Sequence, residues 1–132
     1  MVDHAKYRSQ KLIEAVRNND IDTVIGNLPH AINVNITDKW GTTPLMIACS
    51  KNYKEIVRLL LSHKDINVNL ENSSGATALS LVSSWNKTSL LRMLLDHPNI
   101  DVQYRNKYNQ TAIQQTPHHH GKTIAMLRSK GA

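Results

Sequence analysis

Apolar residues recur along this chain in blocks that follow one another at an interval of 34 residues. Ile56–Leu60 reads IVRLL, Leu90–Leu94 reads LLRML, and Ile124–Arg128 reads IAMLR. In the first block the apolar positions 56, 59 and 60 are three and four residues apart, which is the spacing of one face of an amphipathic helix. A fixed period of this length indicates stacked supersecondary units.

A second motif precedes each block and predicts where a helix begins. Gly41–Leu45 (GTTPL) returns as Gly75–Leu79 (GATAL) and, more faintly, as Asn109–Ile113 (NQTAI). In the first copy Thr43 stands before Pro44, which combines a hydroxyl N-cap with a proline at the first helical position. Each unit is therefore expected to contain a first helix after this motif and a second helix over the apolar block.

The chain must reverse direction between the two helices of a unit, and asparagine occupies that place in three units. Asn19, Asn52 and Asn86 are predicted to adopt the left-handed conformation, which asparagine tolerates better than most residues. In the last unit His120 and Gly121 stand there, so we expect the reversal to shift by one residue.

These patterns predict four pairs of antiparallel helices and an all-α fold with no sheet beyond short turn pairings. Pro117 lies inside the seventh predicted helix. Because proline in a helix interior costs about 3 kcal/mol or more, we expect that helix to be shortened or kinked. The predicted pairs are Gln10–Arg17 with Asp22–Leu28, Pro44–Lys51 with Lys54–Ser62, Ala78–Ser84 with Ser89–Asp96, and Thr111–His118 with Lys122–Ser129. The predicted core residues are Leu45, Ala48, Ile56, Leu60, Leu79, Leu90, Leu94, Ile113 and Leu127.

The Thr43-Pro44-Leu45 start, a first helix of small residues and an Ile/Val-Leu-Leu second helix resemble the ankyrin repeat. The resemblance covers roughly residues 9–132. It implies an all-α ankyrin-repeat solenoid of stacked antiparallel helix pairs joined by β-turn or hairpin loops. The chain ends directly after a second helix, so we expect a complete protein or a cleanly cut domain. The resemblance further implies one domain over residues 1–132, with repeats at about 7–37, 38–70, 71–104 and 105–132; the first and last are degenerate because each has one face in water.

The chain departs from the ankyrin pattern at the residue after the leucine of the start motif, where the family commonly has histidine. Met46, Ser80 and Gln114 stand at this place. We expect the exchange to weaken the hydrogen bonding between turn and helix without changing the fold.

The charge of the chain bears on the kind of partner that it binds. The formal net charge is +6, but the lysines and arginines are dispersed, with no run of three. This pattern favours a solvated surface or attraction to an acidic protein partner, and makes nucleic acid an unlikely partner.

The chain lacks an apolar run long enough to span a membrane. The single cysteine, Cys49, is predicted to be a buried thiol, which suits a reducing, cytoplasmic compartment.

The sequence contains one candidate cluster for catalytic or metal-binding chemistry. His118, His119 and His120 are consecutive, yet neighbouring helical residues point about 100° apart and do not converge on one ion. The chain also has no nucleophile motif and no phosphate-binding glycine loop. We therefore predict a protein that is not an enzyme and that binds no metal or cofactor.

The ankyrin resemblance also implies where a partner binds. In that family, partners occupy the concave side, which is formed by the turn tips and the exposed ends of the first helices. Trp40 and Trp85, the only tryptophans, fall on these positions. They either pack locally over neighbouring repeats or anchor a partner. The predicted protein-binding residues are Arg17, Lys39, Trp40, Lys51, Trp85, Lys107, Tyr108 and His118.

The sequence thus predicts a monomeric interaction module, such as an adaptor, inhibitor or effector. The alternative is a basic anion-binding module for nucleic acid or phosphoinositide surfaces.

Overall fold

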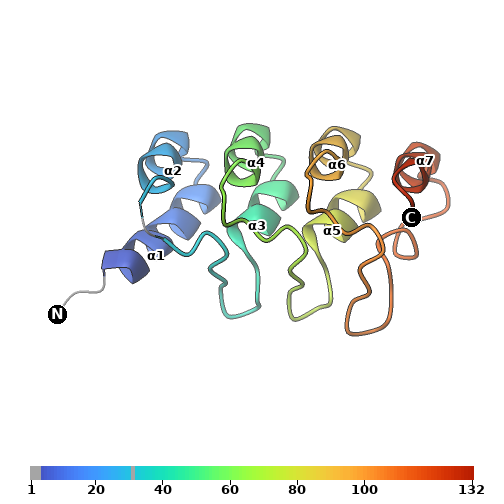
Figure 1. Cartoon of the computed structure of the whole chain (residues 1–132), viewed down its shortest axis with the longest axis horizontal. Helices are drawn as coiled ribbons and strands as arrows, with labels where there is room; N and C mark the ends of the chain where they lie inside the picture. The colour runs from blue at the N-terminus through green and yellow to red at the C-terminus, as the bar shows by residue number, and fades with distance from the viewer. Residues whose placement is uncertain (1–3, 31) are drawn as a thin grey trace. The chain divides into compact units, whose positions relative to one another are not determined.

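The computed structural model describes residues 4–30 and 32–132, and in these it has seven helices and no strand. An isolated antiparallel bridge joins Glu71 to Thr77. Contacts divide the chain into two compact units, residues 1–66 and 67–132. The first unit contains α1 (His4–Arg17), α2 (Ile21–Asn27), α3 (Pro44–Ser50) and α4 (Lys54–Leu61); the second contains α5 (Ala78–Ser84), α6 (Thr88–Leu95) and α7 (Gly121–Ser129) (Figure 1).

Helix pairs form two layers in each unit. In the first unit α1 packs on α2 and α3, and α4 packs on α3 and α2. In the second, α6 packs between α5 and α7. Within each unit, Figure 1 shows the first helices on one side and the second helices on the other: α1 and α3 against α2 and α4 in the first unit, and α5 against α6 and α7 in the second. Most of the buried apolar side chains belong to these helices, and Cys49 in α3 is fully buried, as predicted.

Seven of the eight predicted helices are present, but Thr111–His118 is wrong. This segment forms turns instead of a helix. The last backbone N–H of the segment to donate is that of Thr116, which bonds the Ile113 carbonyl, and the Thr116 hydroxyl donates to the Ala112 carbonyl. Pro117 has no N–H to continue the pattern and disfavours helical backbone at Thr116. The prediction of a shortened helix therefore understated the effect of the proline.

The loss of that helix also explains the one error in the predicted core. Ile113 is only half-buried, because no helix holds it against α6 or α7. The other eight predicted core residues are buried. At the opposite end, α1 begins at His4, earlier than the predicted Gln10.

The first helices α3 and α5 are capped as the start motif predicts. The Thr43 hydroxyl accepts a hydrogen bond of 3.2 Å from the Met46 N–H, and Pro44 is the first helical residue. Thr77 and Ser80 cap α5 reciprocally, each side chain accepting from the backbone N–H of the other. These bonds satisfy N–H groups that have no partner within the helix.

The expectation of weakened turn-to-helix bonding is wrong at two of its three positions. The Ser80 hydroxyl accepts from the Thr77 N–H at 2.9 Å, and the Gln114 side-chain oxygen accepts from the Thr111 N–H at 2.9 Å. Both side chains thus supply an acceptor in the place of histidine, whereas Met46 has no oxygen or nitrogen to offer.

Asparagine reverses the chain in three units, as predicted. Asn19, Asn52 and Asn86 have φ of 52°, 60° and 57°. The prediction fails in the last unit, where His120 has φ −85° and α7 begins at Gly121 with no left-handed residue at the reversal. A left-handed residue is unnecessary there, because no first helix precedes the turn.

Candidate protein-binding surface

Three loops between successive helix pairs each contain the same internal brace, formed by hydrogen bonds from a side chain to the backbone. We call these loops the first, second and third tips (residues 38–42, 72–76 and 106–110). In the first, Asp38 Oδ1 accepts hydrogen bonds of 2.9 Å from both the Trp40 N–H and the Thr42 N–H. Asn72 and Asn106 bind the backbone in the same way at the same places of their tips. The brace fixes the residues at each apex in one backbone conformation. The sequence reasoning missed it, although an Asp or Asn at the 34-residue period was a visible signal.

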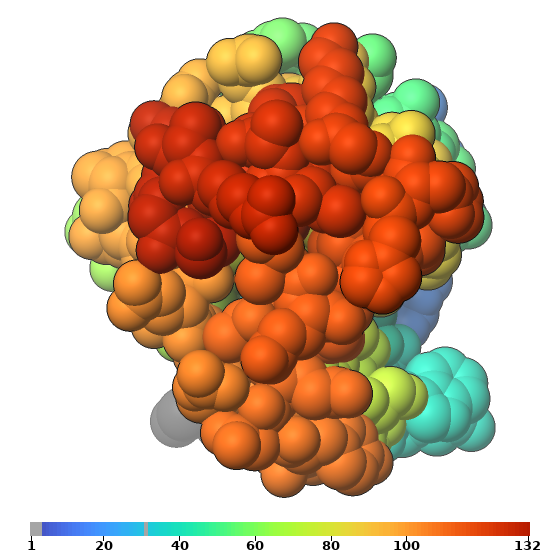
Figure 2. Space-filling view, turned by 90° about the vertical axis from the view of Figure 1, so that its right-hand side faces the viewer, coloured from blue at the N-terminus to red at the C-terminus, as the bar shows by residue number. Residues whose placement is uncertain are grey.

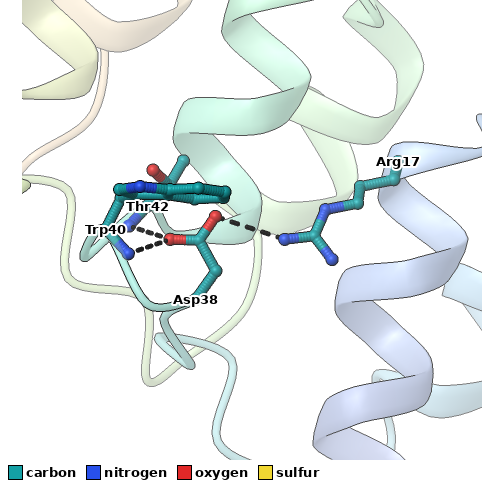
Figure 3. Close-up of polar contacts among 4 residues, drawn as sticks. All are labelled: Arg17, Asp38, Trp40 and Thr42. Atoms are coloured by element: carbon teal, nitrogen blue, oxygen red, sulfur yellow. Dashed lines mark hydrogen bonds and ion pairs between the residues drawn. The ribbon is translucent and has the colours of Figure 1, made fainter.

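An ion pair connects the first tip to α1. Arg17 Nη2 lies 3.2 Å from Asp38 Oδ2, as Figure 3 shows together with the two backbone bonds at Oδ1. Partial burial of the carboxylate opposes its ionisation, but the N–H groups of Thr42 and Trp40 and the Arg17 guanidinium outweigh it. The pKa of Asp38 is therefore held below its usual value. Arg17, a predicted site residue, is thus already bonded to the tip.

The apex of the first tip presents an aromatic ring covered by a lysine. Trp40 is 57% exposed, and Lys39 Nζ lies 4.5 Å from its ring centroid. This is a cation–π arrangement, in which the ring face attracts the ammonium. Lys51, also predicted for the site, is exposed at the C-terminal end of α3.

The Glu71 carboxylate holds the segment that leads into the third tip through two hydrogen bonds. Glu71 Oε1 accepts a 2.5 Å hydrogen bond from the Tyr104 hydroxyl, and Oε2 accepts one of 3.1 Å from the Lys107 N–H. The Tyr104 bond, followed by the Lys107 N–H, lowers the pKa of Glu71, and the same contact raises the pKa of Tyr104. Lys107 also donates from Nζ to the Ser73 carbonyl. Tyr104 therefore helps to hold this loop in place through its hydrogen bond to Glu71.

The third tip is built directly against the second. Asn106 Nδ2 donates to the Gly75 carbonyl at 2.7 Å. A Cβ atom at Gly75 would lie 2.9 Å from that Nδ2 and 3.0 Å from the Tyr108 ring, so the ring rests on the glycine backbone. Tyr108 is nevertheless 61% exposed, and Lys107 Nζ lies 5.6 Å from its centroid. The pair Lys107–Tyr108 thus repeats the arrangement of Lys39–Trp40.

Two further residues of the predicted site lie in the second unit, one at the end of α5 and one before α7. Trp85 ends α5 and is 48% exposed. His118 is exposed in the turns before α7. His119 contacts His120 edge-on, with centroids 4.4 Å apart, and His120 Nδ1 lies 3.4 Å from the Ser83 carbonyl. Over the described part of the chain, no group of three or more His, Cys, Asp or Glu side chains could hold a metal ion.

The eight predicted residues divide equally between the units. The structure joins Arg17 to the first tip and pairs Lys39 with Trp40 and Lys107 with Tyr108. It gives Lys51, Trp85 and His118 exposed positions at helix ends or in turns. The first unit holds Arg17, Lys39, Trp40 and Lys51, and the second holds Trp85, Lys107, Tyr108 and His118.

Short antiparallel helix pairs at a 34-residue period, separated by loops with a common brace, define a helical repeat protein. The family model described as ankyrin repeats (3 copies) matches residues 12–106, which is most of the chain. The chain belongs to the ankyrin-repeat family. Members of this family are generic protein–protein interaction modules and are typically not enzymes. No curated protein matches the chain. Over residues 4–30 and 32–132, no helix has the length and hydropathy needed to cross a membrane.

Proposed function

We propose that this protein binds another protein through its braced tips and the adjoining ends of its first helices, and that it carries out no catalysis. The observation that supports this most directly is the exposed lysine–aromatic pair at the first tip, Lys39–Trp40, and its counterpart Lys107–Tyr108 at the third. Trp85 adds a third exposed aromatic ring at the end of α5.

Binding has to overcome the loss of conformational freedom in loops and side chains at the interface, which costs about 0.5–1.5 kcal/mol for each mobile side chain that is immobilised. At the tips, side-chain acceptors on Asp38 and Asn106 already hold the backbone beside Trp40 and Tyr108. A partner therefore has less ordering to bring about. Large aromatic rings that insert into apolar pockets supply much of the energy of many interfaces.

The lysines in these pairs add a preference for acidic partners. Exposed charges at an interface contribute mainly to the association rate and to specificity, and salt screens their effect. The net charge of +6 acts in the same direction. The proposed partner is thus a protein with an acidic surface around apolar pockets, met by a monomer in the cytoplasm, where the buried thiol of Cys49 stays reduced.

The test begins by capturing the partner from the native host and identifying it by mass spectrometry. Titration calorimetry then compares Trp40→Ala and Trp85→Ala with the parent protein. We expect each substitution to weaken binding by about 2 kcal/mol or more, roughly 30-fold. Tyr7→Ala is the matched control, because Tyr7 is 55% exposed beneath Lys11 but lies in the first turns of α1, outside the proposed surface. Parental affinity in both tryptophan variants, with unchanged circular dichroism, would exclude this surface.

A further inference from the structure

The positive charge of this protein is concentrated near its C-terminal end. Residues 102–132 contain five of the sixteen lysines and arginines and none of the ten acidic residues. Five of the six net positive charges therefore come from this segment, while the preceding residues are almost balanced. Three histidines, His118 to His120, lie in the same segment. Figure 2 looks onto the surface that residues 102–132 form, coloured orange to red.

Helix α7 supplies a cationic face to this surface. Its buried residues, Thr123 and Leu127, lie on one side, and the Thr123 hydroxyl donates to Asn86 Oδ1 at 2.7 Å. On the other side Lys122, Ala125 and Arg128 are exposed. At about 100° per residue, Lys122 and Arg128 flank Ala125 with about 120° between them. The outward side of the helix is thus bordered by two cations and carries no bulky apolar group.

These cations have no carboxylate partner among the described residues. The two ion pairs that the structure contains there, Arg17–Asp38 and Arg58–Glu55, both lie in the first unit. In the second unit Glu71 is already bonded by Tyr104 and by the Lys107 N–H. The charge of α7 is therefore available to a ligand.

We propose that this surface, defined by Lys122, Arg128 and the neighbouring Lys130, binds an acidic segment of a partner protein. Lys122 and Arg128 are six residues apart, or about 9 Å along the helix axis. Because successive side chains of an extended peptide alternate between its two sides, carboxylates on one side lie two or four residues apart, which separates them by about 7 or 13 Å. An extended segment with acidic residues at these spacings can therefore reach both cations together.

The other anionic occupants fit the surface less well. Single-stranded nucleic acid binds where bases stack on aromatic rings, and the exposed face of α7 has none. Binding to anionic membranes relies on clusters of about four to eight basic residues, whereas α7 and the residue after it contribute three, around Ala125. A second copy of this face would bring like charges together.

Binding of an acidic segment at α7 does not depend on binding through the tips, since α7 contains none of the residues proposed there. The test uses fluorescence anisotropy with a labelled oligoglutamate peptide at low ionic strength. The double variant Lys122→Gln/Arg128→Gln should bind it about tenfold more weakly than the parent. The matched control, Lys54→Gln/Lys64→Gln, removes the same charge from exposed positions of the first unit and should stay within about twofold of the parent.

Two results would overturn the proposal. An equal loss in both double variants would mean that only the net charge attracts the peptide. If a single-stranded oligonucleotide or phosphatidylserine vesicles bound more tightly than the oligoglutamate peptide at matched charge, the surface would be assigned to phosphate groups instead of a protein. Circular dichroism and thermal melts of both variants exclude unfolding as the cause of a loss.

Discussion

Arg17 at the end of α1 and Asp38 in the loop between α2 and α3 form an ion pair of 3.2 Å that ties a helix of one repeat to the tip of the next. Asp38 uses its other oxygen to brace the tip itself through two backbone N–H groups. One carboxylate thus serves both the shape of the tip and its attachment, and the two roles can be separated by mutation.

Asp38→Asn should be nearly as mild as Arg17→Ala. Both changes remove the ion pair, but asparagine keeps the Oδ1 acceptor, as Asn72 and Asn106 do in the other tips. A pair this exposed contributes at most about 1 kcal/mol. Asp38→Ala also removes the acceptor and leaves two N–H groups unbraced, so it should cost about 1–2 kcal/mol more. Urea unfolding measures all three. Equal destabilisation by Asp38→Asn and Asp38→Ala would show that the brace contributes nothing.

Stability should fall in acid through Asp38 and Glu71, whose pKa values are lowered in the folded protein. A carboxyl group with a lowered folded pKa contributes stability that is fully present above its unfolded pKa, about 4. This contribution is lost as the pH falls through the lower folded pKa. Asp38→Asn and Glu71→Gln should therefore flatten the decline of the melting temperature below about pH 4. Melting curves of the variants that run parallel to the parent curve across this range would contradict the assignment.

Gly75→Ala should destabilise the second unit strongly. Gly75 has φ +79°, and a Cβ there would collide with Asn106 and the Tyr108 ring. The left-handed backbone alone costs a non-glycine residue about 1–2 kcal/mol, and the collision adds to this. Gly26→Ala is the matched control, because nothing lies within 4 Å of its Cβ position in α2. It should stabilise the protein by about 0.5–1 kcal/mol. Chemical denaturation of both variants gives the comparison, and a neutral Gly75→Ala would show that the third tip moves freely.

Amide hydrogen exchange should be faster over residues 111–130 than over residues 44–62. The earlier range consists mainly of α3 and α4, which pack on each other. The later range replaces a first helix with turns, so α7 packs on α6 with less support. Exchange follows local opening, which is easiest where few buried contacts hold the backbone. Equal protection in the two ranges, measured by mass spectrometry, would contradict this order.

The repeat pattern was sufficient to predict the family, six helices to within two residues at either end, and eight of nine core residues. The reason is that these features depend on local chemistry repeated at a fixed period. Thr43-Pro44 starts a helix wherever it stands, Asn52 and its counterparts tolerate a left-handed turn, and Leu60 or Leu94 is buried because its position in the period faces the neighbouring helix. The start of α1 at His4 and the missing helix before α7 lay outside this regularity.

What the sequence left open depends on residues brought together from different repeats. Arg17 meets Asp38 across 21 positions, Asn106 reaches the Gly75 carbonyl across 31, and Tyr104 binds Glu71 across 33. Each contact requires one loop to lie beside its neighbour, and no local propensity specifies side-chain reach over such distances. The same holds for the charge of α7. Its cations are visible in the sequence, but only the packed structure leaves them without a carboxylate partner among the described residues and turns them outward beside buried Thr123 and Leu127.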